Sequence, residues 1–565
     1  MTWGKRRAIV IILVILFLVG LMIVSARPRA LRLPSNGVLV IDAIGQIEEQ
    51  RAPDFLSAFT GSTVPVLHDF VDAIDTAAKD SHVIGLVVRI APLETGWGKL
   101  EEIRAHLIRF RKSGKPSICY LGYDGIGNPE YYLASACQQV WLVPTAPVSI
   151  RGMMAQALFL RGTLDKLKIV PEFYHIAEYK TASNMFTEKK FTPAHKEEVE
   201  GLLHGIYDQY LSDASTARGM DRAQFEALVN RGPFASNDAL SNKVVDRLGY
   251  WDQVQDYFKK NGKGWNPIPL DRYRPFVKLD GGTKIAVVHA TGLIISGESS
   301  NTPGGGFVMG GDSVASDIRS ARMDSGIKAI VLRVDSGGGS VVGSEVIRRE
   351  VELADHVKPV VVSMSDVAAS GGYWIAAPAR KIVADPDSIT GSIGVLIGKM
   401  NISGLYNLLG LSTDYIATSD NATLFSDQQN FTPAQQEYIQ RSLNQTYADF
   451  AKGVAAGRKM TVEAVDKVGK GRVWTGAQAK NLGLVDELGG LDRAIEIAKQ
   501  LSGIPKDESV RIVRYPEERS FFEQLIERQK DNNMSQSQSI EAILRHIVGE
   551  MGPVQARIPY ELHIR

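Results

Sequence analysis

A long internal repeat constrains the fold of this chain more than any other feature of its 565 residues. The letters FTPA occur at residues 191–194 and again at 431–434, and at the same spacing SNKVVDRLG falls on NLGLVDELG. Further upstream the spacing drifts, but GLVVRI at 85–90 still matches AIVLRV at 329–334. Matches that persist over such a length predict that the chain contains two copies of one domain.

Each copy alternates short β-branched runs with helical patterns. In the second copy IKAIVLRV and PVVVSM are typical of buried strands, and SEVIRREVELADHV between them is typical of an amphipathic helix. This order predicts parallel βαβ units, and therefore an α/β fold in which helices pack on a sheet. The predicted limits are residues 37–260 for the first copy and 284–503 for the second.

Both ends of the chain lie outside the two copies. An uninterrupted apolar run at residues 8–24 follows three basic residues and is long enough to cross a bilayer. For residues 1–36 we therefore expect a cytoplasmic stub, a single transmembrane anchor of the inner (plasma) membrane and a linker, with the body in the periplasm, rather than a cleaved signal. Residues 504–565 are expected to form a partly flexible tail, and its stretch 540–551 is interpreted as a docking helix rather than a membrane contact.

Charge and metal-ligand patterns narrow the functional classes. The chain has 64 basic and 63 acidic residues and no basic stripe, so nucleic acid is not an expected partner. No Cys/His set has metal-ligand spacing, and neither a metal nor another cofactor is expected. The two cysteines make no disulfide framework, and Cys119 lies in a strand-like run, so a buried thiol is favoured there.

The stretch DVAASGGYWIAA (366–377) places Ser370 between a strand pattern and a helical pattern. Taken alone, such a serine is most simply a helix N-cap. Gly371 and Gly372, however, let backbone N–H groups approach a ligand, and a helix that starts there favours a developing oxyanion. A second Gly-rich turn, VLRVDSGGGS (331–340), lies one βα unit earlier and should emerge at the same sheet edge. Ser370 is therefore also a candidate nucleophile.

A serine nucleophile needs a base, and no histidine has an obvious partner for this role. A lysine can serve when burial lowers its pKa toward neutrality, and Lys180 in IAEYKTASNMF is the candidate. The first copy has Asn128 where the second has Ser370, and the second copy has Asn421 at or next to the place of Lys180. Each copy thus holds one half of a Ser/Lys dyad, which predicts a single composite site where the copies meet.

Together these segments resemble bacterial signal peptide peptidase A (protease IV) in its long, two-domain form. The resemblance runs from the apolar N-terminal run to about residue 500, and its specific parts are VLRVDSGGGS, MSDVAASGGYWIAA, DPDSITGSIGV and EYKTA. It implies tandem ClpP/crotonase-like domains and a membrane-anchored serine endopeptidase that works through an acyl-enzyme. It also implies apolar signal peptides as substrates and assembly into a homotetramer.

The same resemblance implies roles for individual residues. The side chain of Ser370 attacks the peptide carbonyl, and Lys180 from the first copy is the general base. Ser392 in the TGSIG segment forms a hydrogen bond with that lysine. The backbone N–H groups that bind the oxyanion belong to Gly338 or Gly339 and to Gly371.

The chain departs from the family in the Gly-rich turn, which reads DSGGG where NSPGG is usual. Gly337 in place of proline loosens the loop. Asp335 in place of asparagine adds a negative charge, which would stabilise the ammonium form of Lys180 if the two side chains are close.

Two other functions stay open at this point. One is a crotonase-like acyl-CoA enzyme, since that fold also uses Gly-rich oxyanion holes. The other is a non-catalytic scaffold built from two degenerate copies. The anchor argues against the first alternative, and the complementary losses in the two copies argue against the second, so a peptidase is favoured.

Overall fold

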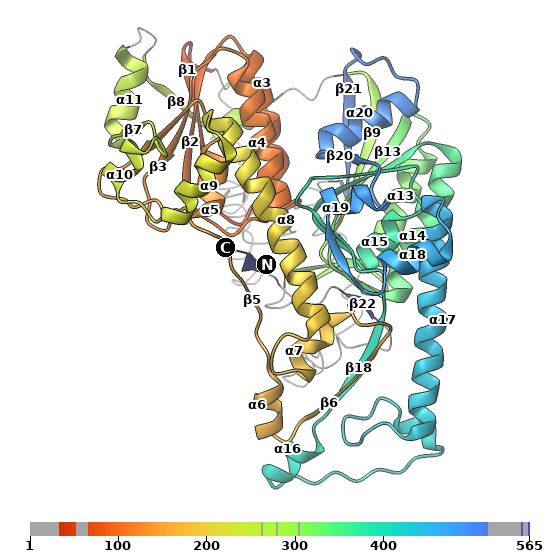
Figure 1. Ribbon diagram of the computed structural model, residues 1–565. Coiled ribbons are helices and arrows are strands. Elements are labelled where there is room, and N and C mark those ends of the chain that lie inside the picture. Colours follow the sequence, from red (N-terminus) through yellow and green to blue (C-terminus); the bar gives the residue numbers. More distant parts are fainter. Residues whose placement is uncertain are drawn as a thin grey trace, which may run out of the picture.

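The computed structural model describes residues 33–51, 66–260, 264–277, 281–302, 306–517, 555–557 and 563–564. In this part of the chain two α/β units stand side by side, one from each copy of the repeat (Figure 1). The predicted transmembrane anchor and the predicted docking helix lie outside the described residues. A search of the described helices finds none that combines the length and the apolar character needed to cross a membrane.

The first unit is built on a parallel sheet with six strands among the described residues, in the order β7-β4-β3-β2-β1-β8. Its inner strands are almost continuously apolar, as expected for strands that are covered on both faces. The strands are β1 (Gly37–Gly45), β2 (Val83–Leu93), β3 (Ser117–Leu121), β4 (Gln139–Leu142), β7 (Arg247–Leu248) and β8 (Asn266–Pro269).

The second unit contains a corresponding parallel order, β20-β16-β15-β13-β9-β21. These strands are β9 (Thr283–Thr291), β13 (Ile327–Ser336), β15 (Val360–Ala369), β16 (Lys381–Ala384), β20 (Glu487–Leu488) and β21 (Val510–Tyr515). At its carboxyl end β15 pairs instead with β17 (Ile389–Gly391), to which β19 (Val473–Thr475) pairs antiparallel.

The two sheets therefore repeat one topology strand for strand, which confirms the predicted tandem α/β domains. Each sheet also takes an edge strand from just beyond a predicted limit. Strand β8 follows residue 260, and β21 follows residue 503.

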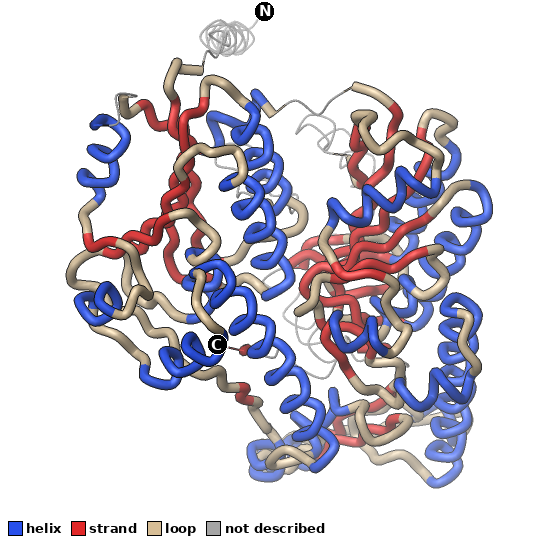
Figure 2. The backbone as a smooth tube through the Cα atoms, turned by 45° about the horizontal axis from the view of Figure 1, so that its top comes forward, coloured by secondary structure: helices blue, strands red, loops and turns tan. Residues whose placement is uncertain are grey.

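Helices cover both faces of each sheet, as the strands flanked by helices in Figure 2 show. Helices α11 (Trp251–Lys260) and α20 (Leu491–Leu501) pack on one face of their respective sheets. The other faces carry α3 (Leu67–Lys79), α4 (Trp97–Arg111) and α5 (Asn128–Ala134) in the first unit, and α13 (Gly311–Met323), α14 (Val341–Val357) and α15 (Gly371–Ala376) in the second.

In both units a long helix begins at the Thr-Pro pair of the repeated FTPA letters. Helices α8 (Pro193–Arg218) and α17 (Pro433–Arg458) are each 26 residues long. Thr192 and Thr432 cap them, because each side chain accepts a backbone N–H from the residue three positions later.

A third sheet joins the units, in the order β11-β12-β10-β14-β22-β18-β6. Strand β6 (Val170–His175) leaves the first unit and pairs antiparallel with β18 (Leu396–Asn401) of the second, below both units in Figure 1. The other members are β10 (Leu293–Ile295), β11 (Ser300–Thr302), β12 (Gly306–Gly310), β14 (Gly338–Ser340) and β22 (Gln555–Arg557). This pairing places the segment after β6 against the second unit.

The expectation of a free buried thiol at Cys119 is wrong. Cys119 and Cys137 form a disulfide bond, and their Cα atoms are 5.7 Å apart. Cys119 lies in β3, and Cys137 follows α5, which packs back against that strand. The βα unit thus brings together two cysteines that are 18 residues apart in the sequence.

Candidate active site

Ser370 lies at the sharp turn between β15 and α15. Its φ of 56° and ψ of −116° are a sparsely populated backbone conformation, which costs a non-glycine residue on the order of 1–3 kcal/mol. A hydrogen bond from its backbone N–H to the Gly391 carbonyl, 2.8 Å long, helps to hold this conformation. Its side chain makes no capping hydrogen bond to α15, so the N-cap interpretation does not apply here.

Lys180 reaches this turn from the first unit, shortly after β6. Its Nζ lies 2.7 Å from Ser370 Oγ and 3.1 Å from Ser392 Oγ, and all three residues are fully buried. The lysine fits because Gly471 leaves room for its backbone, where a Cβ would collide with it. The structure thus brings together the two half-sites that the sequence comparison separated.

The surroundings of Lys180 favour its neutral form. Burial lowers its pKa to about 7, and the negative charge of Glu198 limits this fall. Glu198 is buried in α8, where its carboxylate accepts the backbone N–H of Val473 at 2.8 Å and the hydroxyl of Thr181 at 3.1 Å. A lysine with such a pKa is a competent proton acceptor near neutral pH.

Ser392 holds Lys180 from the far side of the turn. Besides its hydroxyl, its carbonyl oxygen accepts a hydrogen bond from Lys180 Nζ at 3.3 Å. Ser392 also has a positive φ, 51°, and its N–H donates to the Arg472 carbonyl at 2.7 Å. The lysine amine is therefore oriented by two acceptors on one well-anchored residue.

The Gly-rich turn lies directly beside Gly371. The backbone nitrogen of Gly339 is 3.2 Å from the position that a Cβ on Gly371 would take. The N–H of Gly338 instead donates to Ser336 Oγ at 3.1 Å, and that hydroxyl donates to the Gly292 carbonyl. Gly338 is equally near, since its Cα lies 3.1 Å from the same position, but its N–H already has a partner within the turn, which favours Gly339 as the donor.

Asp335 does not face Lys180, so the suspected effect of this substitution on the base is not seen. Its carboxylate lies 2.7 Å from Nζ of Lys99, a buried lysine of α4 in the first unit. Only burial and Glu198 affect the pKa of Lys180. The charge at residue 335 is therefore compensated by a residue that the sequence analysis overlooked.

A strand of the C-terminal tail lies across the site. In β22 Ala556 is opposite Gly339 and Gln555 is opposite Leu396, and the strand contacts α15. Both pairings are antiparallel, so β22 fills the slot between β14 and β18. With β22 in this slot, the Ser370 side chain has no exposed surface.

The counterparts of the dyad in the opposite copies form no second pair. Asn128 is buried at the start of α5, where its side-chain oxygen accepts the N–H of Arg151 at 3.0 Å. Asn421 lies in an exposed 3₁₀ turn of the second unit.

Two separate regions of the chain, residues 109–264 and 352–505, match the family model "Peptidase family S49". The chloroplastic serine protease SPPA of Arabidopsis thaliana is 35% identical to this chain, and the alignment covers 85% of this chain and 72% of the relative. Protease 4 of Salmonella typhi is 37% identical, with 77% of this chain and 72% of the relative aligned. Protease 4 of Haemophilus influenzae is 32% identical, with 86% of this chain and 82% of the relative aligned.

The chain belongs to peptidase family S49. It is a serine peptidase of the SppA type, and the matched regions fall one in each α/β unit. A solved mutant of the 1510-N membrane-bound stomatin-specific protease, in complex with a substrate peptide, aligns with 44% of the chain and 97% of its own length at 15% identity, with a TM-score of 0.26. A mutant of ClpP1 from Listeria monocytogenes aligns with 37% of this chain and 94% of its own length at 12% identity, with a TM-score of 0.24. Similarities at these TM-scores do not establish a shared fold.

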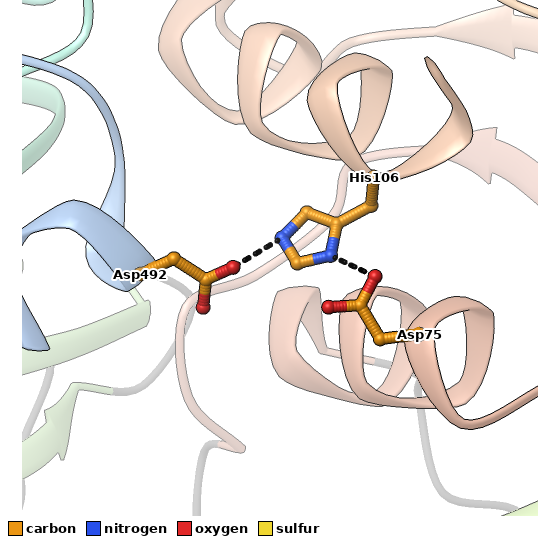
Figure 3. Close-up of side chains that lie close together, drawn as sticks. All are labelled: Asp75, His106 and Asp492. Atoms are coloured by element: carbon orange, nitrogen blue, oxygen red, sulfur yellow. Dashed lines mark ion pairs between the residues drawn. The ribbon is translucent and has the colours of Figure 1, made fainter. Parts of the chain in front are cut away.

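The S49 peptidase also contains a cluster with the residue types of a metal site, drawn in Figure 3. His106 of α4 lies between Asp75 of α3 and Asp492 of α20, at 2.9 and 3.5 Å. The Arg109 guanidinium is 2.6 Å from the same Asp492 carboxylate and already supplies positive charge. We interpret the cluster as an ionic contact between the two units of the peptidase.

Sequence reasoning missed Glu198 and Lys99 in the S49 peptidase. Glu198 lies on the buried face of α8, four and eight residues before Leu202 and Ile206, so an acidic residue on an apolar helix face was the available signal. Lys99 carried a signal, because it lies in TGWGKL, the place in the first copy that corresponds to the Gly-rich turn of the second.

Proposed function

We propose that this peptidase is a membrane-anchored endopeptidase that cleaves remnant signal peptides and similar apolar peptides through Ser370 and Lys180. The observation that carries the proposal is the buried 2.7 Å contact between Lys180 Nζ and Ser370 Oγ. The peptide class is taken from the resemblance to signal peptide peptidase A, and the reaction follows from the geometry below.

In the first half of the reaction, neutral Lys180 accepts the hydroxyl proton of Ser370 as Oγ attacks the peptide carbonyl carbon. The N–H groups of Gly339 and Gly371 stabilise the oxyanion, a contribution that is typically about 10²–10³-fold in rate for each donor. The lysine then gives its proton to the leaving amine, and the C–N bond breaks to leave an acyl-enzyme on Ser370.

In the second half a water molecule attacks the ester, and Lys180 accepts a proton from it. The peptide carboxylate leaves, and the proton returns to Ser370 Oγ, which restores both groups. Ser392 keeps the amine pointed at Oγ in both halves, as its 3.1 Å contact with Nζ indicates.

We propose that the peptide binds as an extended strand between β14 and β18. The tail strand β22 supports this, because its backbone pairs with Gly338–Ser340 and with Leu396 beside the Ser370 turn. Strand addition to a sheet edge is a common mode of peptide recognition, in which hydrogen bonds to the peptide main chain provide the affinity. A slot of this kind suits varied signal peptide remnants.

We also propose that the peptidase works outside the inner membrane. The Cys119–Cys137 disulfide supports this location, because disulfides persist in oxidising compartments and are rare in reducing ones. Thiol titration of the unreduced protein should find no free cysteine, and two free thiols would contradict the location.

We further propose a homo-oligomer, a tetramer by resemblance. The stretch 403–424 supports it, because it carries exposed apolar side chains that include Leu411, Tyr415 and Ile416. The corresponding segment of the first copy crosses to the second unit and delivers Lys180. An equivalent crossing from the second copy would reach the first unit of a neighbouring chain, which is a head-to-tail contact that can close a ring. Light scattering should give a smaller particle for Leu411→Asp/Ile416→Asp than for wild type; equal masses would contradict this contact.

Mutation of the dyad tests the proposed function. Ser370→Ala and Lys180→Ala should each lower hydrolysis of an apolar peptide ester at least about 10³-fold, since each removes a reacting group. Lys358→Ala is the control, because the Lys358 amine donates to the carbonyls of Ala321, Asp324 and Ile327, outside the dyad and the slot between β14 and β18. Full activity in either dyad variant would overturn the assignment, whereas equal loss in the control would show only general damage.

A further inference from the structure

Lys99 links the first unit to the two strands that carry the catalytic turns. Its Nζ lies 2.7 Å from Asp335 Oδ2 and 2.8 Å from Asp366 Oδ2. Its backbone N–H also donates to Asp366 Oδ1, at 2.9 Å. Lys99 has only 4% of its surface exposed, so these contacts form in the interior between the units.

The two carboxylates lie in the strands that lead to the two turns of the candidate active site, so a displacement of either carboxylate would move a turn. Asp335 is the penultimate residue of β13, immediately before the Gly-rich turn. Asp366 lies in β15, four positions before Ser370. Asp335 Oδ1 also accepts the N–H of Val367 at 3.2 Å, so the two strand ends are tied to each other as well. A single ammonium group thus joins the strand that leads to Gly339 with the strand that leads to Gly371.

The loop that presents Lys99 is shaped for close contact. A Cβ on Gly96 would collide with the Asp366 carboxyl group, and one on Gly98 would come within 3.0 Å of the Ser365 carbonyl oxygen. The match of GLVVRI with AIVLRV places this loop at the position of the Gly-rich turn in the first copy. The first copy's counterpart of the Gly-rich turn therefore packs against β15, the strand that leads to Ser370.

The charges make this link persistent. Burial opposes the ammonium form of Lys99, but the carboxylates of Asp335 and Asp366 outweigh it and hold the pKa of Lys99 well above its usual range. Removal of one partner from a buried ion pair leaves uncompensated charge and is strongly unfavourable. Burial also raises the pKa of the Asp335 carboxyl to about 6, so the link should stay closed above that pH and weaken below it.

We propose that Lys99 is a positioning residue that holds the oxyanion donors of Gly339 and Gly371 in register with Ser370. The proposal rests on the function proposed above for Ser370. Lys99 touches neither the nucleophile nor the base, and it acts through Asp335 and Asp366. Displacement of a catalytic group by about 1 Å can cost on the order of 10²-fold in rate.

The test compares Lys99→Met, Lys99→Arg and the control Arg109→Met in the full chain, with an apolar peptide ester as substrate. Arg109 lies on the same helix and also pairs with the second unit, through Asp492, but about 15 Å farther along the axis. We expect kcat of folded Lys99→Met to fall about 10–100-fold with KM within about 2-fold, because donors aimed at the transition state are misplaced. Lys99→Arg should recover much of the loss, and Arg109→Met should match wild type.

The pH profile separates positioning from other roles. The midpoint of kcat/KM in Lys99→Met should stay at the wild-type value, because Lys99 does not affect the pKa of Lys180. Unchanged kcat in folded Lys99→Met, an equal loss in Arg109→Met, or a midpoint shift that accounts for the loss would each overturn the proposal. Should Lys99→Met fail to fold, Lys99→Met/Asp366→Asn removes one uncompensated carboxylate and is expected to show the same loss of kcat.

The two proposals fail in different ways. An active Ser370→Ala variant would refute the proposed function, whatever Lys99→Met does. An inactive Ser370→Ala together with a fully active Lys99→Met would refute only the positioning role.

Discussion

Lys180 Nζ lies 2.7 Å from Ser370 Oγ, although the two residues are 190 positions apart and belong to different copies of a duplicated domain. The contact exists because β6 of the first unit pairs with β18 of the second and carries Lys180 across. Each copy holds one half of the proposed dyad, so neither copy is expected to hydrolyse peptides without the other.

The first prediction concerns pH. Since burial lowers the pKa of Lys180 to about 7, most of the amine is protonated below that pH and cannot accept the Ser370 proton. We expect kcat/KM for a peptide ester to rise about tenfold per pH unit below the midpoint and to level off above pH 7 to 8. A midpoint near the ordinary lysine value of about 10 would contradict the assignment of Lys180 as base.

The second prediction concerns stability. Between the lowered pKa of Lys180, about 7, and its value of about 10.4 in the unfolded chain, the unfolded state binds more protons, so stability of the wild type should rise with pH. Lys180→Met lacks this cost and should melt a few degrees higher than wild type at pH 7 while being inactive. Calorimetry at pH 7 and pH 10 checks this, and the difference should shrink at the higher pH. A lower melting temperature for Lys180→Met than for wild type at pH 7 would argue that burial of the Lys180 amine does not destabilise the fold.

The third prediction concerns Ser392, which binds the Lys180 amine through its hydroxyl at 3.1 Å. Ser392→Ala leaves the residue 392 carbonyl as the one remaining contact that orients the amine toward Ser370, and we expect about a tenfold loss in kcat. The control is Ser388→Ala, whose buried hydroxyl donates to the Ser365 carbonyl and not to the dyad. Equal kcat values in the two variants would remove Ser392 from the mechanism.

The fourth prediction concerns the tail strand. A chain that ends at residue 554 lacks β22, which fills the slot between β14 and β18. Its KM for a peptide should fall several-fold, because the substrate no longer competes with the tail, and kcat should change little. Steady-state kinetics on both chains measure this effect, and an unchanged or raised KM would place the peptide elsewhere.

Sequence patterns were sufficient for the local structure and for the choice of the two side chains that meet in the candidate site. The period of β-branched runs predicted the parallel strands, and comparison of the two copies singled out Ser370 and Lys180, because each is present in only one of them. Their contact depends on a pairing between β6 and β18 that no local pattern encodes. The Cys119–Cys137 bond was missed for the same reason, since proximity there arises from the return of α5 over β3.

Contacts between the two units were the hardest to foresee. Lys99 forms hydrogen-bonded ion pairs with Asp335 and Asp366, more than 200 positions away in the chain. The hydrophobic period of a segment does not show which distant charge it will pair with. The substitution at Asp335 suggested an effect on Lys180, but a third residue neutralises it. Ionic contacts across an interface depend on the docking of whole domains and require coordinates.

The most direct test of the composite site is labelling with a serine-reactive phosphonate at pH 8, followed by mapping of the adduct by mass spectrometry. The account predicts a single adduct on Ser370 in the wild type and labelling that is slowed at least about 10³-fold in Lys180→Met. An adduct on another residue, or equally fast labelling of Ser370 without the Lys180 amine, would contradict it.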